Sequence, residues 1–194
     1  LSSPTAGEAF ICGHSTNKES SEVKKIVGIS PQDTAVAGNL TVRENLELMA
    51  GIYGFDKAGT ARRIADMTKL FRLDKVLDSR SKTLSGGWKR KLSIAMALIS
   101  EPKVLFLDEP TLGLDVLARR ELWSAVNSLK GKITIILTTH YMEEAEQLSD
   151  RIAIMVGGRI CASGTLEKLE RQSGETGLEN AFVKIAEQAG GAES

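Results

Sequence analysis

The chain has 194 residues, enough for one medium-sized domain with a hydrophobic core. Its formal net charge of zero gives no electrostatic basis for binding nucleic acid or an acidic membrane. No apolar stretch approaches the roughly 20 residues that span a bilayer. Cys12 and Cys161 have neither metal-site nor disulfide-framework spacing, so we expect two reduced, buried thiols in a cytosolic protein. Because residue 1 is Leu rather than Met, we expect the chain to be part, or a processed form, of a longer protein.

Short apolar runs alternate with longer amphipathic segments, which is typical of an α/β fold with a largely parallel sheet. Early strands are predicted at 9–13 and 24–30. A helix is predicted at 41–54, where a Thr and a Glu in capping-box spacing precede apolar residues at helical intervals. A second amphipathic helix follows at 60–73. We therefore expect residues 38–99 to form an α-helical subdomain.

The pattern changes at "KVLFLDEP", a continuous apolar run that begins at residue 103 and indicates a buried parallel strand. We expect a core at 100–165 and a C-terminal helical tail at 166–194. The remaining elements are predicted as helices at 116–129 and 142–149, strands at 133–140 and 151–156, a polar linker near 171–177 and a closing helix at 178–188.

Asp108 and Glu109 directly follow this apolar strand. Open α/β sheets bind ligands at the carboxyl ends of their strands, so both carboxylates are expected in such a crevice. In nucleotide hydrolases the first carboxylate helps to hold Mg²⁺, and the second can position or polarise the attacking water. A strand that merely ends in a polar turn is the plainer interpretation.

Three further polar residues follow predicted strands or begin a helix. Asp115 precedes a helix, where an N-cap is the plain interpretation. His140 closes the next strand after the Asp108–Glu109 strand, which we also expect to be buried, and this place favours a functional role over a structural one. Gln32 lies just past another strand, and its carbonyl oxygen can bind a metal or water, although a solvated loop is the default.

The stretch "LSGGWKRK" at 84–91 has the glycines and the backbone N–H groups that can hold a phosphate. Five features follow one another along the chain: a Gln after a strand, LSGG, an apolar strand that ends in DEP, GLD, and a His after a strand. In this order they resemble the nucleotide-binding domain of ATP-binding-cassette (ABC) transporters, and the resemblance runs from about residue 4 to 168. The resemblance implies a P-loop NTPase-like (RecA-like) core with a mostly parallel sheet and an α-helical subdomain.

The resemblance also implies roles for individual residues. Ser85, Gly86 and Gly87 are similar to the signature motif, which contacts the γ-phosphate of ATP held by a second cassette. Gln32 resembles the Q-loop glutamine, which touches Mg²⁺ and the attacking water and links the site to the membrane subunit. The segment near "NLTVREN" is expected to form the groove for the permease.

The other residues of the set resemble the hydrolytic machinery. Asp108 is similar to the Walker B aspartate, a Mg²⁺ ligand, and Glu109 to the catalytic glutamate. Asp115 resembles the D-loop aspartate, and His140 the switch histidine at the γ-phosphate. ATP and Mg²⁺ are therefore the expected ligands.

The chain departs from the family pattern in two places. Trp88 stands where a Gln is common, and we expect it to pack at the start of a helix rather than to stack on a base. No G-x-x-x-x-G-K-[ST] P-loop occurs in the 194 residues. Gly131 and Lys132 form the only Gly-Lys pair, and they precede a strand. We therefore expect the chain to begin after the P-loop helix of its family, and to hydrolyse no ATP alone.

The expected function is that of the ATPase subunit of an exporter, peripheral on the inner face of the cell membrane, with a permease of the ABC-2 type and a second nucleotide-binding domain as partners. An alternative is a non-hydrolysing cassette that donates its signature motif in trans. A soluble cassette acting on ribosomes or DNA is a third hypothesis, but such proteins usually carry two cassettes or large insertions.

Overall fold

The computed structural model describes residues 4–190. The chain divides into two compact units, Leu1–Thr138 and Thr139–Ser194. The finer division at 38–99, 100–165 and 166–194 stays a prediction.

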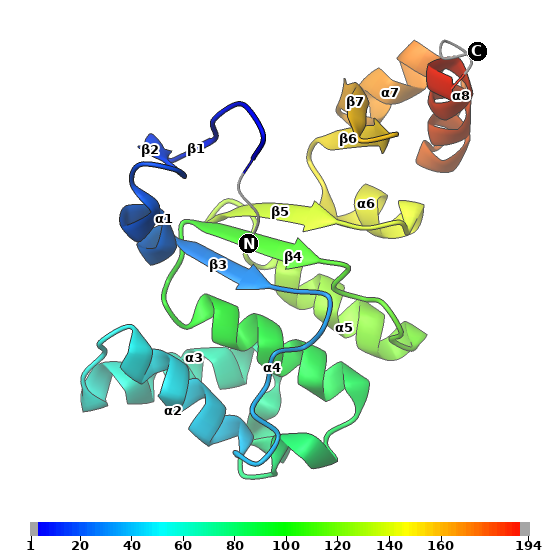
Figure 1. Ribbon diagram of the computed structural model, residues 1–194. Coiled ribbons are helices and arrows are strands. Elements are labelled where there is room, and N and C mark those ends of the chain that lie inside the picture. Colours follow the sequence, from blue (N-terminus) through cyan, green and yellow to red (C-terminus); the bar gives the residue numbers. More distant parts are fainter. Residues whose placement is uncertain (1–3, 191–194) are drawn as a thin grey trace. The chain divides into compact units, whose positions relative to one another are not determined.

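The first unit is built on a three-stranded parallel sheet (Figure 1). Its strands are β3 (Val27–Ser30), β4 (Val104–Asp108) and β5 (Thr134–Thr138), in the order β3-β4-β5. The predicted parallel α/β architecture is thereby confirmed. All three strands run in the same direction, so the last residues of β3, β4 and β5 lie at one edge of the sheet.

A small hairpin and a helix precede this sheet. They comprise β1 (Phe10–Ile11), β2 (His14–Ser15) and α1 (Ser20–Ile26). The strand predicted at 24–30 is therefore wrong at its start, because residues 24–26 close α1. Glu22 in the first turn and Lys25 in the last complement the helix dipole and pair at 2.7 Å between Nζ and Oε1. Cys12 is exposed in the hairpin turn and Cys161 is partly buried, so the expected burial of both thiols is wrong.

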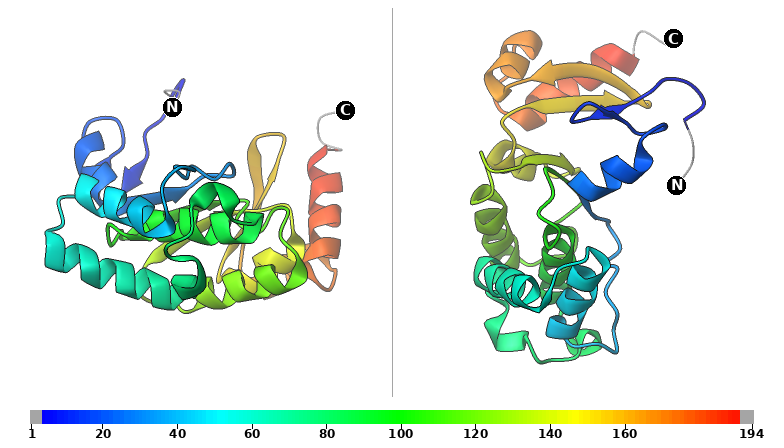
Figure 2. Two further views of the ribbon diagram at one scale, coloured as in Figure 1. Left: turned by 90° about the horizontal axis from the view of Figure 1, so that it is seen from below. Right: turned by 90° about the vertical axis from the view of Figure 1, so that its left-hand side faces the viewer.

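The region between β3 and β4 is helical, as predicted. The capping box is confirmed: the Thr41 hydroxyl accepts from the backbone N–H of Glu44, whose carboxylate accepts from the N–H of Thr41. Helices α2 and α3 contact each other and α4 (Figure 2). The elements are α2 (Val42–Ile52), α3 (Lys57–Phe71), η1 (Leu73–Val76), η2 (Ser81–Thr83) and α4 (Gly86–Leu98).

The two faces of the sheet have different surroundings. Helices α4 and α5 (Val116–Asn127) lie on one face (Figure 1), where a Cβ added to Gly28 would come within 2.3 Å of the Ala97 carbonyl oxygen. On the other face Ile29, Phe106 and Ile136 form a cross-strand row, and the first and last of them are 58% and 44% exposed. We call this side the open face of the sheet.

The second unit contains a β-hairpin and three helices. Its elements are α6 (Met142–Leu148), β6 (Ile152–Val156), β7 (Arg159–Gly164), α7 (Leu166–Ser173) and α8 (Leu178–Gly190). Ile154, Leu169 and Leu178 are part of its hydrophobic core. The linker predicted at 171–177 begins later, because residues 171–173 complete α7 before Gly174 ends it at φ 76°. Across both units, none of the described helices is long and apolar enough to cross a bilayer.

Candidate functional site

The carboxyl end of β4 carries the predicted carboxylates. Asp108 is the last residue of β4 and is exposed. The hydroxyl of Thr138, its partner on β5, donates to Asp108 Oδ1 at 2.5 Å. This hydrogen bond fixes the orientation of the Asp108 carboxylate, while its second oxygen stays available. Sequence reasoning missed Thr138, although it is the first polar residue after the apolar part of β5.

Glu109 has an unusual backbone conformation. Its φ of 46° lies in the left-handed region, which non-glycine residues seldom occupy. Its backbone N–H donates to the Thr138 carbonyl oxygen at 3.0 Å, and its own carbonyl accepts from the Leu112 N–H at 3.2 Å. These bonds hold a conformation that costs about 1–3 kcal/mol. Such strain is often found at functional sites, and here it orients the second predicted carboxylate.

The loop after β3 is held by the helix that follows the LSGG stretch. Arg90 donates from Nη1 to the Pro31 carbonyl oxygen at 2.7 Å and from Nη2 to that of Gln32. The Ser30 and Ser93 hydroxyls are hydrogen-bonded at 3.0 Å in a buried position. Because Arg90 binds main-chain oxygens, the Gln32 side chain takes no part in this anchoring and is exposed.

Ser85, Gly86 and Gly87 form the start of α4. Ser85 is the N-cap residue, but its side chain makes no capping hydrogen bond. The first backbone N–H groups of a helix have no intrahelical acceptor, so they can bind an anion. A Cβ added to Gly86 would meet no heavy atom within 4 Å, whereas one added to Gly87 would contact Ala118 Cβ at 3.4 Å. Gly86 is therefore open to a ligand, and Gly87 packs on α5.

Asp115 caps α5. Its Oδ1 accepts hydrogen bonds from the N–H groups of Leu117 and Ala118, both at 2.9 Å. The plain interpretation of Asp115 as an N-cap is thus confirmed, and its role at a nucleotide stays a prediction. Ala118 is also the neighbour of Gly87. The start of α5 therefore supports the start of α4 directly.

Trp88 packs at the start of α4. The ammonium Nζ of Lys91 lies 4.5 Å from the centroid of the Trp88 ring, a cation–π contact. The same Nζ pairs with Glu121 Oε2 on α5 at 2.5 Å. The Lys91 side chain is only 7% exposed, and its hydrogen bond holds the pKa of Glu121 below the usual value. Glu121 therefore neutralises the charge of a buried ammonium, and the Trp88 ring adds a cation–π contact.

His140 lies two residues beyond the end of β5, in the second unit. It is exposed, and its ring centroid is 4.1 Å from that of Tyr141 at an interplanar angle of 39°. The strand before it was expected to be buried, but the residues of β5 are half-buried or exposed. Its role at a γ-phosphate stays a prediction.

The first unit brings three groups of predicted residues to defined positions: the loop of Gln32, the start of α4, and the end of β4 with Asp108 and Glu109. The roles of Arg90 and Lys91 could not be read from the sequence. Both lie in the basic stretch after LSGG, but their partners are about 30 and 59 residues away. Spacing along the chain gives no signal for such contacts.

The chain was compared with known families. The family model described as ABC transporter matches residues 1–112, more than half of the chain. The chain belongs to the ABC transporter family. It has the fold of ABC ATP-binding domains: the solved structure of an ATP-binding subunit of an ABC transporter superposes with a TM-score of 0.79 and 33% identity, covering 90% of this chain and 74% of that one. A dimeric ATP-binding cassette in a post-hydrolysis state, bound to ADP and phosphate, gives a TM-score of 0.74 and 26% identity, over 85% of this chain and 75% of that one.

Relatives of this ABC domain occur in bacteria and mammals. The probable multidrug ABC transporter ATP-binding protein YbhF of Escherichia coli K12 is 37% identical over 188 residues, which cover 94% of this chain and 32% of the relative. The human phospholipid-transporting ATPase ABCA3 is 40% identical over 171 residues, which cover 88% of this chain and 10% of the relative. The chain thus spans a third or less of the length of these two relatives.

Proposed function

We propose that this chain belongs to the ATP-binding subunit of an ABC exporter. This subunit would lie at the inner face of the cell membrane and act with a permease of the ABC-2 type. The names of two relatives support a role in transport, one a probable multidrug ABC transporter ATP-binding protein and one a phospholipid-transporting ATPase. A dimeric relative bound to ADP and phosphate supports a second cassette as partner.

The observation that carries the proposal is the start of α4. Ser85 leaves its hydroxyl out of the helix cap, and the backbone around Gly86 is unobstructed. In the proposed dimer Ser85, Gly86 and the Gly87 N–H would bind the γ-phosphate of ATP held by the second cassette. Charge on that phosphate grows in the transition state, so donors held in place by α5 would lower the barrier.

The hydrolytic roles follow the same proposal. Glu109 would orient and polarise water for in-line attack, and His140 would stabilise the charge that develops on the γ-phosphate. Mg²⁺ is commonly held by one or two carboxylates together with phosphate oxygens and water, and Asp108 with Gln32 suits that pattern. The bound ion would neutralise charge on the phosphates. Asp115 would lie where the two cassettes meet.

The 194 residues contain no G-x-x-x-x-G-K-[ST] sequence, so they lack the N–H nest and lysine that bind phosphates within one cassette. We therefore propose that these 194 residues hydrolyse no ATP alone, and the alternative is a non-hydrolysing cassette that donates the start of α4 to a second cassette. Hydrolysis by these residues themselves would instead give turnover that depends on Glu109.

Phosphate release from Mg-ATP by the purified chain separates these two cases. We expect no turnover above that of a Glu109→Gln variant. Turnover that Glu109→Gln abolishes would overturn the proposal that these residues are inactive alone.

A second assay tests the donation itself. The chain is added to a cassette that has a P-loop but a disabled signature motif, and we expect ATP hydrolysis to rise. Gly86→Glu should abolish the rise, because a carboxylate would occupy the phosphate position without disturbing the packing of α4. Gly51→Glu is the matched control, since Gly51 is also a helical glycine with open space around it. Gly87→Glu is less informative, because its Cβ would lie 3.4 Å from Ala118 Cβ, so the new side chain would also alter the packing of α4 on α5. Equal stimulation by both variants would contradict a role for the start of α4.

A further inference from the structure

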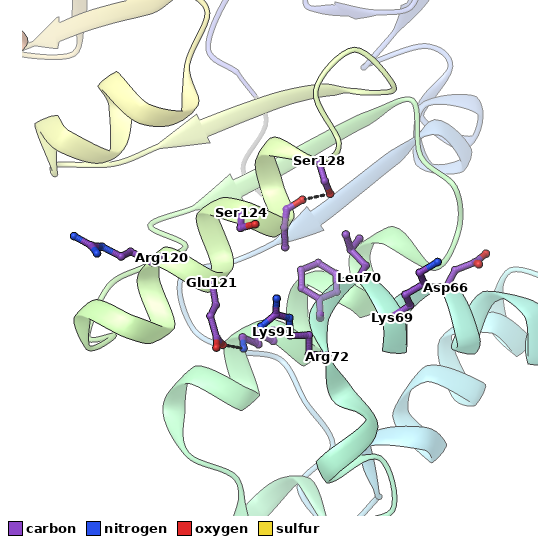
Figure 3. A pocket seen from close by; sticks show the side chains of 11 residues that line it. Asp66, Lys69, Leu70, Arg72, Lys91, Arg120, Glu121, Ser124 and Ser128 are labelled. Atoms are coloured by element: carbon purple, nitrogen blue, oxygen red, sulfur yellow. Dashed lines mark hydrogen bonds and ion pairs between the residues drawn. The ribbon is translucent and has the colours of Figure 1, made fainter.

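A cavity of about 570 Å³ lies beside the helices α3 and α5, and none of the residues of the proposed nucleotide site lines it (Figure 3). Residues of α3, its C-cap Arg72, Lys91 of α4 and one side of α5 line it. Its volume falls within the range of small-molecule sites, about 300–1,000 Å³. The charged residues of its lining are Asp66, Lys69, Arg72, Lys91, Arg120 and Glu121.

The lining carries an excess of positive charge. Each of the two carboxylates is already paired, Glu121 with Lys91 at 2.5 Å and Asp66 with Arg63 at 3.5 Å between Oδ2 and Nη1. In the described part of the chain, Lys69, Arg72 and Arg120 form no ion pair with any carboxylate. These three exposed cations thus border one cavity without an ion pair, and Arg72 adds, after Lys91, to the attraction that lowers the pKa of Glu121.

The helix dipole accounts for only part of this arrangement. Lys69 lies in the last turn of α3, where a cation stabilises the helix end. Arg120 lies within α5, between Val116 and Asn127, and is not in the last turn of that helix. Arg72 follows α3 in the left-handed conformation, at φ 56°. In Figure 3 Arg72 lies near Lys91 in the middle of the pocket, and Lys69 and Arg120 lie toward opposite ends.

We propose that this pocket binds a small phosphate-bearing anion through Arg72 and Lys69, with Arg120 at its rim. A guanidinium presents two parallel N–H donors to phosphate oxygens, and an ammonium adds a point charge. Ser124 on α5 supplies a hydroxyl to the same cavity. The apolar Leu70 and Phe71 line it as well, so an ester with an apolar part fits better than the free ion.

The pocket is connected to the start of α4 through Lys91. Its ammonium contacts both Glu121 and the ring of Trp88, the residue next to Gly87. An anion bound at Arg72 would compete with Glu121 for the attraction of Lys91. The Lys91–Trp88 contact would then change, so binding in the pocket would alter the packing next to residues 84–87. Trp88 is therefore a built-in fluorescent reporter of binding.

The test uses the 194-residue chain carrying Trp123→Phe, which leaves Trp88 as the remaining tryptophan. Inorganic pyrophosphate is the probe, titrated without ATP or partner at constant ionic strength against sodium chloride. We expect a saturable change in Trp88 emission. Lys69→Gln and Arg72→Gln should each weaken binding about tenfold, the effect of one lost hydrogen bond to a charged group. Asp66→Asn should tighten it.

Arg62→Gln is the matched control. Arg62 is exposed on α3 and does not line the cavity, so this variant has the same net charge as Lys69→Gln and should bind normally. Circular dichroism confirms that all variants are folded. Equal affinity of Arg62→Gln and Arg72→Gln, or a response that sodium chloride reproduces, would overturn the proposal. Citrate that binds as tightly as pyrophosphate would overturn the assignment to phosphate. Because neither ATP nor a second cassette is present, the result is independent of the proposed transport function.

Discussion

The two faces of the β3-β4-β5 sheet differ in packing: one is closely covered by helices and the other is partly exposed to solvent. On the covered face the backbone of β3 approaches α4 so closely that only glycine fits at residue 28. On the open face Ile29 and Ile136 keep about half of their surface exposed, and the Asp108–Thr138 hydrogen bond lies in line with them. Packing therefore constrains the covered face, whereas the open face carries one of the proposed chemical groups. Substitutions of the same type should have unequal effects on the two faces.

Gly28→Ala is expected to be the most destabilising change. The new Cβ would lie 2.3 Å from the Ala97 carbonyl oxygen and 3.1 Å from Pro102 Cγ, so α4 or β3 must move. We expect a loss of about 3 kcal/mol or more in the free energy of unfolding, measured by urea denaturation. Gly51→Ala, at an open helical position, is the control and should be neutral or stabilising. A neutral Gly28→Ala would show that the covered face is loosely packed.

Glu121→Gln should weaken the contact between α4 and α5, the two helices of the covered face. It leaves the buried Lys91 ammonium without its carboxylate, and because Glu121 itself is 47% exposed we expect a loss of about 1–2 kcal/mol. Lys91 lowers the pKa of Glu121 below 4.5, so this stabilisation is complete above that pH and is lost as the pH falls through the lower, folded value. The difference from the wild type should therefore vanish in acid. Glu187→Gln, on the exposed side of α8, should change neither stability nor its pH dependence.

Thr138→Val tests the polar end of the open face. It removes the hydrogen bond to Asp108, and we expect a loss of only about 0.5–1 kcal/mol because water can replace the donor. Thr134→Val, on the same face of the same strand, is the matched control. If Thr138→Val costs no more than Thr134→Val in thermal denaturation, the bond contributes to orientation alone.

Ile29→Lys should have the smallest effect on stability and the clearest effect on association. The side chain is 58% exposed, so unfolding should change by less than about 0.5 kcal/mol. A row of exposed apolar side chains on a sheet favours contact between copies of the chain. We expect light scattering at high concentration to show self-association of the wild type and less of it in Ile29→Lys. Ile52→Lys, on the exposed surface of α2, should leave association unchanged. A monomeric wild type would contradict the prediction.

The sequence alone was sufficient to predict the elements that depend on a local residue pattern. The capping box of α2, the apolar strand that ends at Asp108 and the glycines that begin α4 could all be assigned from spacing of a few residues. Helix α1 was missed for a related reason. Its seven residues are too short to show a helical period, and the apolar residues that follow suggested an earlier start of β3.

The contacts that position the candidate site could not be predicted. Arg90 and Lys91 are adjacent in a basic stretch that suggests a solvated surface, yet both residues are buried. Their burial depends on partners that the fold brings from 30 or more residues away. Likewise, nothing in the sequence indicates that Glu109 adopts φ 46°, because that conformation is imposed by hydrogen bonds to a neighbouring strand.

The way in which Arg90 holds the loop after β3 has a consequence for sequence variation. Its guanidinium binds main-chain carbonyl oxygens, which every amino acid possesses, so the anchoring of residue 32 does not depend on the side chain at that position. Mutation at position 32 can therefore alter chemistry without altering shape. A relative that replaced Gln32 but kept Arg90 would retain the backbone conformation of the loop after β3 and could bind a different ligand.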